Sequence, residues 1–108
     1  MNTNQIDFKI NTQSFLTRSD CVKHLENTRN GLVIIHLNIC SIFKHFEELL
    51  ILIHELKYYP DVIICTETKK IDINLYNIQG YTAYYNNGNI NQNDGVITYI
   101  KMNWLKNI

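Results

Sequence analysis

Two polar residues, Asn38 and Glu67, stand at the ends of long apolar runs and could act together on a metal ion. An amide oxygen and a carboxylate are hard ligands, and Mg²⁺ is often held by only one or two protein carboxylates beside water and phosphate. Glu67 would supply the negative oxygen, while Asn38 would offer an oxygen to the ion or an N–H to a phosphate oxygen. In the alternative, Asn38 caps a strand-to-helix turn and Glu67 is a solvated loop residue, since strand ends commonly carry polar residues.

A strand, a helix and a second strand must position these two residues. The apolar run at 32–39 predicts a strand that is covered on both faces, and the run at 61–66 predicts another. Between them the sequence predicts a helix over 42–57, because apolar residues recur there at helical spacing. Such a unit pairs its strands in parallel through a right-handed crossover. Both polar residues would then lie at the carboxyl edge, where open α/β sheets bind ligands.

The predicted helix has recognisable ends and an amphipathic pattern. Ser41 is a suitable N-cap residue. Pro60 disfavours helical geometry at Tyr59, so the helix should end before this pair. The apolar residues expected to face the sheet are Phe43, Phe46, Leu49, Leu50, Ile53 and Leu56.

The pattern is less regular after this unit. Residues 69–77 predict a loop with a short helical turn, and two further strands are expected near 80–85 and 95–100. These two strands should form a hairpin with a long polar loop. The expected fold class is therefore α/β, a β-α-β unit followed by a β-hairpin.

Length and composition limit the classes of protein that are compatible with the chain. Its 108 residues allow one domain at most, and 45% hydrophobic with 19% charged residues indicates a folded protein. The formal net charge of zero argues against a dedicated nucleic-acid-binding module. It does not argue against an enzyme that contacts phosphate through a metal ion. Residues 1–30 are mostly polar, and we interpret them as a peripheral lead-in that is partly irregular.

The cysteines and the length of the apolar runs indicate the cellular compartment in which the protein is expected. Cys21, Cys40 and Cys65 are an odd number without CxxC spacing, which argues against a disulfide framework and for a reducing environment. The first residues lack the basic and apolar regions of a signal peptide. No apolar run is long enough to cross a bilayer. We expect an intracellular protein, nuclear or cytoplasmic, that is not secreted and has no membrane partner.

The histidines are weaker candidates for chemistry. His45 and His54 are nine residues apart, which does not match the spacing of a helical zinc site. His36 lies within the first predicted strand and is expected to be an interior residue. We therefore expect none of these three, nor His24, to bind a metal.

One cysteine and several tyrosines also fall within predicted strands. Cys65 is expected to be an inert small hydrophobic residue. The tyrosines could form a platform that stacks nucleic acid bases. Their strand spacing favours packing within the sheet instead; they are Tyr81, Tyr84, Tyr85 and Tyr99.

Five segments, taken in order and spacing, resemble the endonuclease/exonuclease/phosphatase superfamily. The resemblance is to the apurinic-type endonuclease domain that precedes the reverse transcriptase in non-LTR (jockey-like) retrotransposons. It covers roughly residues 31–102. The segments are His-Leu-Asn-Ile-Cys-Ser-Ile at 36–42, Lys-His-Phe-Glu-Glu-Leu at 44–49, Pro-Asp-Val-Ile-Ile-Cys-Thr-Glu-Thr at 60–68, Tyr-Asn-Ile-Gln-Gly-Tyr at 76–81, and Asn-Asp-Gly-Val-Ile-Thr-Tyr-Ile-Lys at 93–101.

This resemblance implies a metal-dependent phosphodiesterase with a two-sheet α/β sandwich core. The strand-one Asn of the family matches Asn38 and its metal-binding Glu matches Glu67, so both are expected to be catalytic residues and metal ligands. Mg²⁺ (or Mn²⁺) is the implied cofactor, and DNA is the implied partner of the intact enzyme. At position 69 the chain has Lys, as in the Glu-Thr-Lys of the apurinic endonucleases, whereas retrotransposon members usually have Trp there. Cys40 stands where those elements commonly have Arg.

The family's later motifs are not found among the 108 residues. They contain an Asp and an Asn that orient the attacking water, and an Asp–His pair that supports the phosphate transition state. We therefore expect residues 31–108 to be a partial domain, the amino-terminal fragment of a DNA endonuclease that is inactive alone: a truncated element, a gene-model fragment or a remnant. Its uncovered sheet face should favour self-association. The alternative is a non-catalytic small α/β domain that acts as a protein-interaction module.

Overall fold

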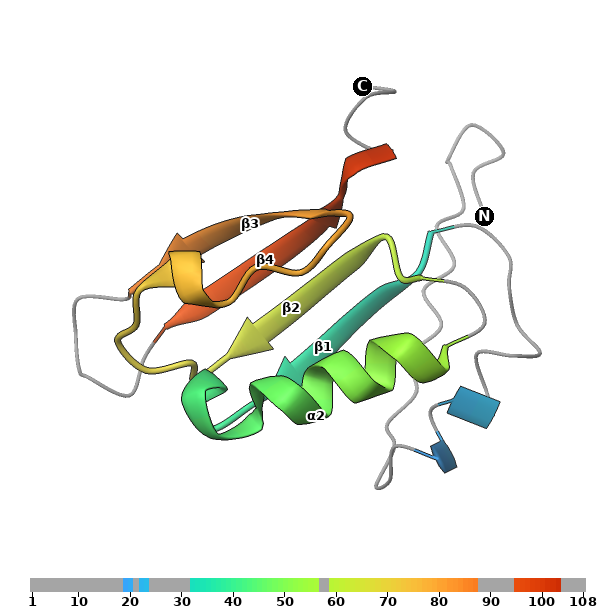
Figure 1. Ribbon diagram of the computed structural model, residues 1–108, viewed down its shortest axis with the longest axis horizontal. Coiled ribbons are helices and arrows are strands. Elements are labelled where there is room, and N and C mark those ends of the chain that lie inside the picture. Colours follow the sequence, from blue (N-terminus) through green and yellow to red (C-terminus); the bar gives the residue numbers. More distant parts are fainter. Residues whose placement is uncertain (1–18, 21, 24–31, 57–58, 88–94, 104–108) are drawn as a thin grey trace, which may run out of the picture.

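The computed structural model describes residues 19–20, 22–23, 32–56, 59–87 and 95–103. Over these ranges the chain has a mixed α/β fold, which confirms the predicted class (Figure 1). Each predicted strand and the predicted helix is present, with ends within two residues of those expected. In chain order the elements are β1 (Ile34–Asn38), α2 (Ile42–Glu55), β2 (Val62–Thr66), the 3₁₀-helix η1 (Ile73–Leu75), β3 (Tyr81–Asn86) and β4 (Val96–Lys101).

The strands form a single four-stranded sheet in the order β1-β2-β4-β3. β1 and β2 are parallel, with Asn38 opposite Thr66 at their carboxyl ends. β4 runs antiparallel to β2 on one side and to β3 on the other. The predicted β-α-β unit and hairpin are both confirmed. Because β1 and β2 end at the same edge, the loops that follow them meet there.

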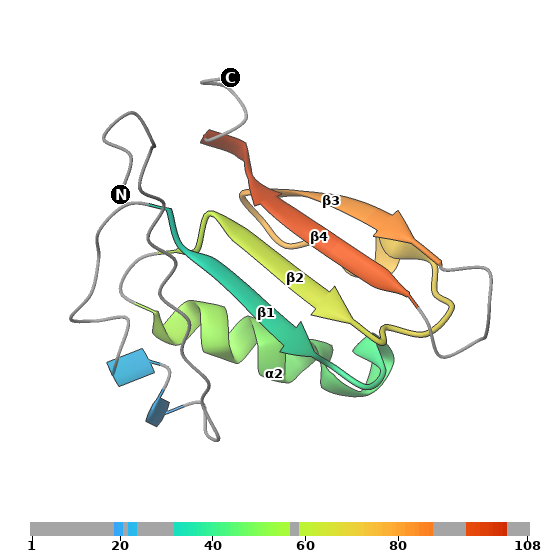
Figure 2. The ribbon, with the colours of Figure 1, turned by 180° about the vertical axis from the view of Figure 1, so that it is seen from behind.

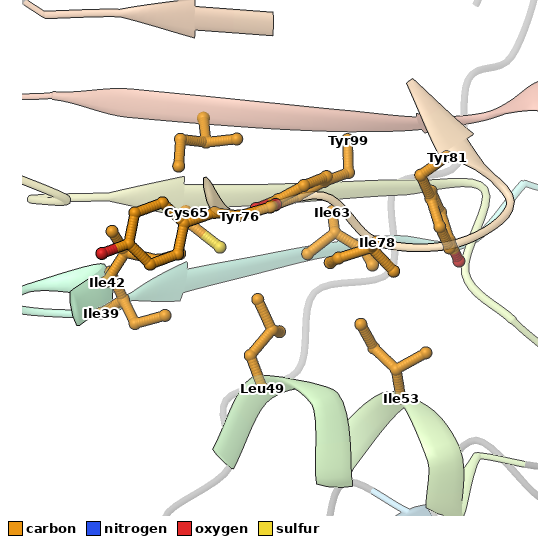
Figure 3. Packing of buried hydrophobic residues seen from close by; sticks show 11 residues of the cluster. Ile39, Ile42, Leu49, Ile53, Ile63, Cys65, Tyr76, Ile78, Tyr81 and Tyr99 are labelled. Atoms are coloured by element: carbon orange, nitrogen blue, oxygen red, sulfur yellow. The ribbon is translucent and has the colours of Figure 1, made fainter. Parts of the chain in front are cut away.

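One face of the sheet is covered by α2 and by the segment that contains η1, which lie on the same side of the strands (Figures 1 and 2). Figure 3 shows Leu49 and Ile53 pointing from α2 toward the sheet and toward Ile78. Each such side chain contributes about 1.5–3 kcal/mol when fully buried. The core cluster contains Ile39, Ile42, Leu49, Ile53, Ile63, Cys65, Tyr76, Ile78, Tyr81, Ile97 and Tyr99.

The hydroxyl groups of two core tyrosines, Tyr81 and Tyr99, both donate hydrogen bonds to backbone carbonyls. The Tyr99 hydroxyl donates a hydrogen bond to the Tyr76 carbonyl at 2.6 Å, and the Tyr81 hydroxyl donates to the Pro60 carbonyl at 2.5 Å. The rings of Tyr81 and Tyr99 meet edge to face, with centroids 6.5 Å apart. The prediction that the strand tyrosines pack in the core is confirmed for Tyr81 and Tyr99, and it is wrong for Tyr84, which is 51% exposed.

The helix buries a different set of residues from the one predicted. Ile42, Leu49, Leu52 and Ile53 are the buried residues within α2. Phe43 is 80% exposed and Leu50 is also exposed, so the predicted sheet-facing stripe is wrong at these two positions. The register of the helix against the sheet decides the outcome, because apolar residues lie side by side at 42–43 and 49–53.

The opposite face of the sheet is open, since no described segment lies over it (Figure 2). Ile34 and Tyr84 are 54% and 51% exposed there. The prediction that β1 is covered on both faces is therefore wrong within the described residues. Strand alternation places on this face Ile34, His36, Asn38, Val62, Ile64, Thr66, Thr82, Tyr84, Asn86, Val96, Thr98 and Ile100.

The predicted lead-in, 1–30, is described only at 19–20 and 22–23, which have helical backbone. Val22 packs against Leu52 and Leu56 of the helix end. The rest of the lead-in, with Cys21 and His24, lies outside the described residues. Among the described helices, none has the length and apolar character needed to cross a membrane.

Candidate functional site

Asn38 and Glu67 lie at the same edge of the sheet, as the parallel topology predicts. Asn38 is the last residue of β1 and faces Thr66, and Glu67 follows Thr66 directly. The Ile39 amide donates to the Thr66 carbonyl at 3.0 Å, so the strand pairing continues past the end of β1. Both candidate side chains are exposed. The register therefore brings an amide and a carboxylate to neighbouring positions that a ligand can reach.

The loops after β1 and β2 are joined by their backbones. The Ser41 amide donates to the Glu67 carbonyl at 2.8 Å, and the Ile42 amide donates to the Thr68 carbonyl at 3.3 Å. These amides belong to the first positions of α2, where N–H groups have no partner within the helix. The second loop satisfies them. The start of the helix, which carries the positive end of its dipole, therefore lies against the residue that carries the candidate carboxylate.

The backbone of these two loops adopts conformations that L-residues rarely take. The non-glycine residues with positive φ in the described chain are Cys40 (49°), Ser41 (100°), Glu67 (56°) and Lys69 (66°). Each such residue costs on the order of 1–3 kcal/mol and persists only where the surrounding contacts hold it. Strain of this kind clusters at ligand sites. All of it in the described chain falls within the two loops at the carboxyl edge.

Ser41 does not act as the predicted side-chain cap. It occupies the N-cap position of α2, but its side chain makes no capping hydrogen bond. Its contribution is the backbone amide that binds the Glu67 carbonyl. The capping prediction fails because the residue is buried with a left-handed backbone, a geometry set by the neighbouring loop.

The Asn38 side chain is only partly used by the protein. Its Oδ1 accepts a weak hydrogen bond from the Cys40 thiol at 3.3 Å, inside the strand-to-helix turn. This contact agrees with a local role in the turn. An amide has two donors and two acceptor lone pairs. One thiol bond therefore leaves most of its capacity for a ligand.

The Glu67 carboxylate makes no hydrogen bond or ion pair with another residue that the structure describes. It is exposed and lies at the same edge of the sheet as Asn38. A carboxylate and an amide are hard oxygen ligands of the kind that Mg²⁺ or Mn²⁺ takes. Within the described ranges, no three His, Cys, Asp or Glu side chains gather closely enough to hold a metal ion. Asn38 and Glu67 would supply at most two protein oxygen ligands, so a cation held by them would keep most of its water.

Two other side chains, those of Tyr85 and His45, support the edge through contacts that the sequence pattern does not predict. The Tyr85 hydroxyl donates to the Lys69 carbonyl at 3.1 Å and lies 3.3 Å from the Ile71 amide, which donates to it. His45 Nδ1 lies 2.7 Å from the Ile39 carbonyl, so α2 also contacts the turn that follows Asn38. These contacts depend on tertiary packing, and apolar periodicity gives no signal for them.

The remaining candidates are distributed over both faces of the sheet. His36, predicted to be interior, is exposed on the open face, where its Nε2 lies 3.0 Å from Thr66 Oγ1. The prediction fails because β1 is an edge strand with one open face. Tyr84 also lies on that face, so the tyrosines do not share one stacking platform. Cys65 is buried, as expected, and burial raises the pKa of its thiol to about 12.

The chemistry of the carboxyl edge is thus the strongest indication of function in the described residues. It consists of an exposed amide and an exposed carboxylate that are held by strained, mutually bonded loops. Comparison with known proteins adds no assignment: no family model matches the chain, and no curated protein matches it significantly.

Proposed function

We propose that residues 31–108 form the amino-terminal portion of a Mg²⁺-dependent DNA endonuclease domain from a non-LTR retrotransposon, with Mn²⁺ as a substitute ion. The observation that carries this proposal is the juxtaposition of Asn38 and Glu67 at the carboxyl edge of the parallel pair. The sequence resemblance to the endonuclease/exonuclease/phosphatase superfamily supports the same two residues. Such an enzyme acts inside the cell, which favours a nuclear or cytoplasmic location.

Asn38 and Glu67 would hold the ion, which when bound would polarise a phosphoryl oxygen and stabilise the charge that develops during phosphodiester hydrolysis. Glu67 brings the negative oxygen, and Asn38 brings an oxygen for the ion or an N–H for a phosphate oxygen. The positive end of the α2 dipole would favour the phosphate group of the substrate and would oppose the cation itself. The groups that orient the attacking water lie in the family's later motifs. The 108-residue chain is therefore proposed to lack nuclease activity.

The open face of the sheet is a second support. In a two-sheet sandwich the inner faces of both sheets pack about 10 Å apart and exclude water. Ile34 and Tyr84, each more than half exposed here, would be buried by a second sheet. The open face is thus the side on which the rest of such a domain would pack.

The proposal is tested by nicking of supercoiled plasmid with a version of the domain that also carries the family's later motifs. Glu67→Gln is nearly isosteric and removes the negative oxygen, so it should abolish Mg²⁺-dependent nicking while the fold is retained. Glu48→Gln removes an exposed carboxylate from α2 and should leave the rate unchanged. Equal nicking by the Glu67→Gln variant and the parent domain would refute the mechanism.

A second candidate is a non-catalytic domain that binds a protein partner through the open face. Its specific support is the exposure of Ile34 and Tyr84 on the open face, in the two edge strands of the sheet. The two candidates differ in the residues on which they depend. Partner binding would be lost on Tyr84→Lys and would be indifferent to Glu67→Gln, whereas metal binding would show the reverse.

A further inference from the structure

The loop that carries Glu67 is held in place by Thr68, its fully buried neighbour. The Thr68 amide donates to the Gly95 carbonyl at 3.2 Å, and the Thr68 carbonyl accepts from the Ile42 amide at 3.3 Å. Thr68 is therefore bonded on one side to the residue that precedes β4 and on the other to the start of α2. The exposed residues on both sides of it, Glu67 and Lys69, have positive φ.

The contact between Thr68 and Gly95 requires that residue 95 has no side chain. Gly95 has a φ of +147°, which L side chains rarely adopt. A Cβ at this position would overlap Thr68 Oγ1 and would lie 3.0 Å from the Lys69 carbonyl oxygen. Any larger residue at 95 must push Thr68 or the following peptide away from β4.

A displacement of Thr68 would be passed on to Glu67 through the backbone. Thr68 Oγ1 donates to the Lys69 carbonyl at 3.1 Å, which fixes the turn after Glu67. The left-handed conformations of Glu67 and Lys69 are costly, so they need these tertiary contacts to persist. Without them, the turn would relax toward ordinary backbone geometry, and the direction of the Glu67 side chain would change.

We propose that Gly95 and Thr68 are positioning residues, whose close contact sets the place of the Glu67 carboxylate beside Asn38 and hence the metal affinity of this edge. The role in metal affinity rests on the proposed function. The role in holding the Glu67 turn rests only on the contacts above. The residue that precedes β4, a strand that contributes no ligand to the edge, would thereby control the position of the residue that contributes the charge.

The chain contains a matched control for this proposal. Gly80 also has a positive φ, +88°, but a Cβ there would meet nothing within 4 Å. Gly80→Ala and Gly95→Ala therefore both place alanine in a left-handed conformation, and only Gly95→Ala displaces Thr68. The readout is hydrogen exchange of the Ser41 and Ile42 amides, which bond the carbonyls of Glu67 and Thr68.

Gly95→Ala should speed exchange of these two amides by about tenfold relative to the core amide of Cys65, whereas Gly80→Ala should not. Thr68→Ala removes the hydrogen bond to the Lys69 carbonyl without adding a side chain at position 95, so it should also speed exchange of the two amides. If Gly95→Ala does not fold, Thr68→Ala still tests the proposal. Equal exchange in the two single glycine variants, or unchanged exchange in Thr68→Ala, would overturn the proposal.

The same variants separate this inference from the proposed function. If the parent chain binds Mn²⁺ at the edge, then Gly95→Ala should reduce Mn²⁺-induced broadening of the Asn38 amide signal, and Gly80→Ala should retain it. Equal broadening in both variants would refute the role in metal affinity. A parent chain without broadening refutes the proposed function, while the exchange rates still decide whether Gly95 and Thr68 hold the Glu67 turn.

Discussion

The carbonyl oxygen of Glu67 accepts a hydrogen bond from the Ser41 amide at 2.8 Å. This bond joins the loop after β2 to the N-cap residue of α2. Ser41 also follows Asn38 closely along the chain. The positions of the two candidate ligands are therefore coupled through backbone contacts. The geometry of the edge should be sensitive to changes in these loops, even where the changed side chain does not reach a ligand.

The strain at Ser41 leads to a first prediction. Its φ of 100° favours glycine, and its side chain makes no capping hydrogen bond that glycine would lose. Ser41→Gly should therefore raise the free energy of unfolding by about 1 kcal/mol, as measured by urea denaturation. Ser41→Ala is the control, and it should cost less than the ~1 kcal/mol typical of a lost N-cap. A Ser41→Gly variant less stable than the parent would contradict the strained conformation.

The face that α2 buries leads to a second prediction. Leu49→Ala should lower the free energy of unfolding by about 2–5 kcal/mol, because it leaves a cavity under the sheet. Phe43→Ala should change it by less than about 0.5 kcal/mol, because Phe43 is exposed. The predicted stripe from sequence alone would place both residues in the core. Equal losses of unfolding free energy in the two variants, measured by chemical denaturation, would contradict the buried face described here and support the one predicted from sequence.

These helix positions illustrate what the sequence can and cannot determine about the fold. The strands and the helix are predictable, because their apolar runs and spacing match one type of element each. The register of the helix is not, because Ile42 and Phe43 are adjacent apolar residues and both fit helical spacing. The open face is also not predictable from the pattern. Ile34 and Ile64 lie on the open face but are apolar, like the adjacent residues Ile35 and Ile63 on the covered face. The sequence pattern therefore does not distinguish the open face from the covered one.

The candidate site is likewise only partly predictable from the sequence. Asn38 and Glu67 could be placed at one edge from sequence, since parallel strands bring their carboxyl ends together. The left-handed backbone at Ser41 and Glu67 could not, because these residue types do not favour it and it arises from hydrogen bonds between distant loops. The contact of Gly95 with Thr68 is likewise a tertiary feature, although a glycine directly before a strand is a recognisable sign of close backbone approach.

Alkaline pH should destabilise the protein, beginning with Cys65. Burial raises the pKa of its thiol from 9.0 to about 12. The buried neutral thiol therefore contributes full stability below about pH 9, and this contribution is lost as pH rises through the folded value. Between about pH 9 and pH 10 the free energy of unfolding should fall with a slope of up to 1.4 kcal/mol per pH unit, roughly, before tyrosines contribute.

Cys65→Ala is the comparison for this slope. It removes the thiol, so urea denaturation at increasing pH should give a flatter curve in this interval, whatever the loss of core packing. The decline should then steepen at higher pH in both proteins. Burial, followed by the charges of Cys65 and Tyr76, raises the pKa of Tyr99 in the same direction. An unchanged slope in Cys65→Ala would contradict the burial of the thiol.

The open face predicts self-association that charge can suppress. Tyr84→Lys should lower the fraction of dimers or larger species in sedimentation velocity, because an unpaired charge would be buried in any face-to-face contact. Phe43→Lys adds the same charge to an exposed apolar residue on α2 and should leave association unchanged. A parent chain that stays monomeric at high concentration, or a loss of association only in Phe43→Lys, would exclude this face as the contact.

The most direct test of the metal site is a Mn²⁺ titration of the isotopically labelled 108-residue chain, followed by broadening of amide signals in NMR spectra. Broadening should centre on Asn38 and Glu67, should be weak because two ligands leave most of the shell to water, and should be displaced by Mg²⁺. Glu67→Gln should remove it, and Glu48→Gln should leave it unchanged. Broadening that centres elsewhere, or that is the same in Glu67→Gln as in the parent, would contradict a metal site at this edge.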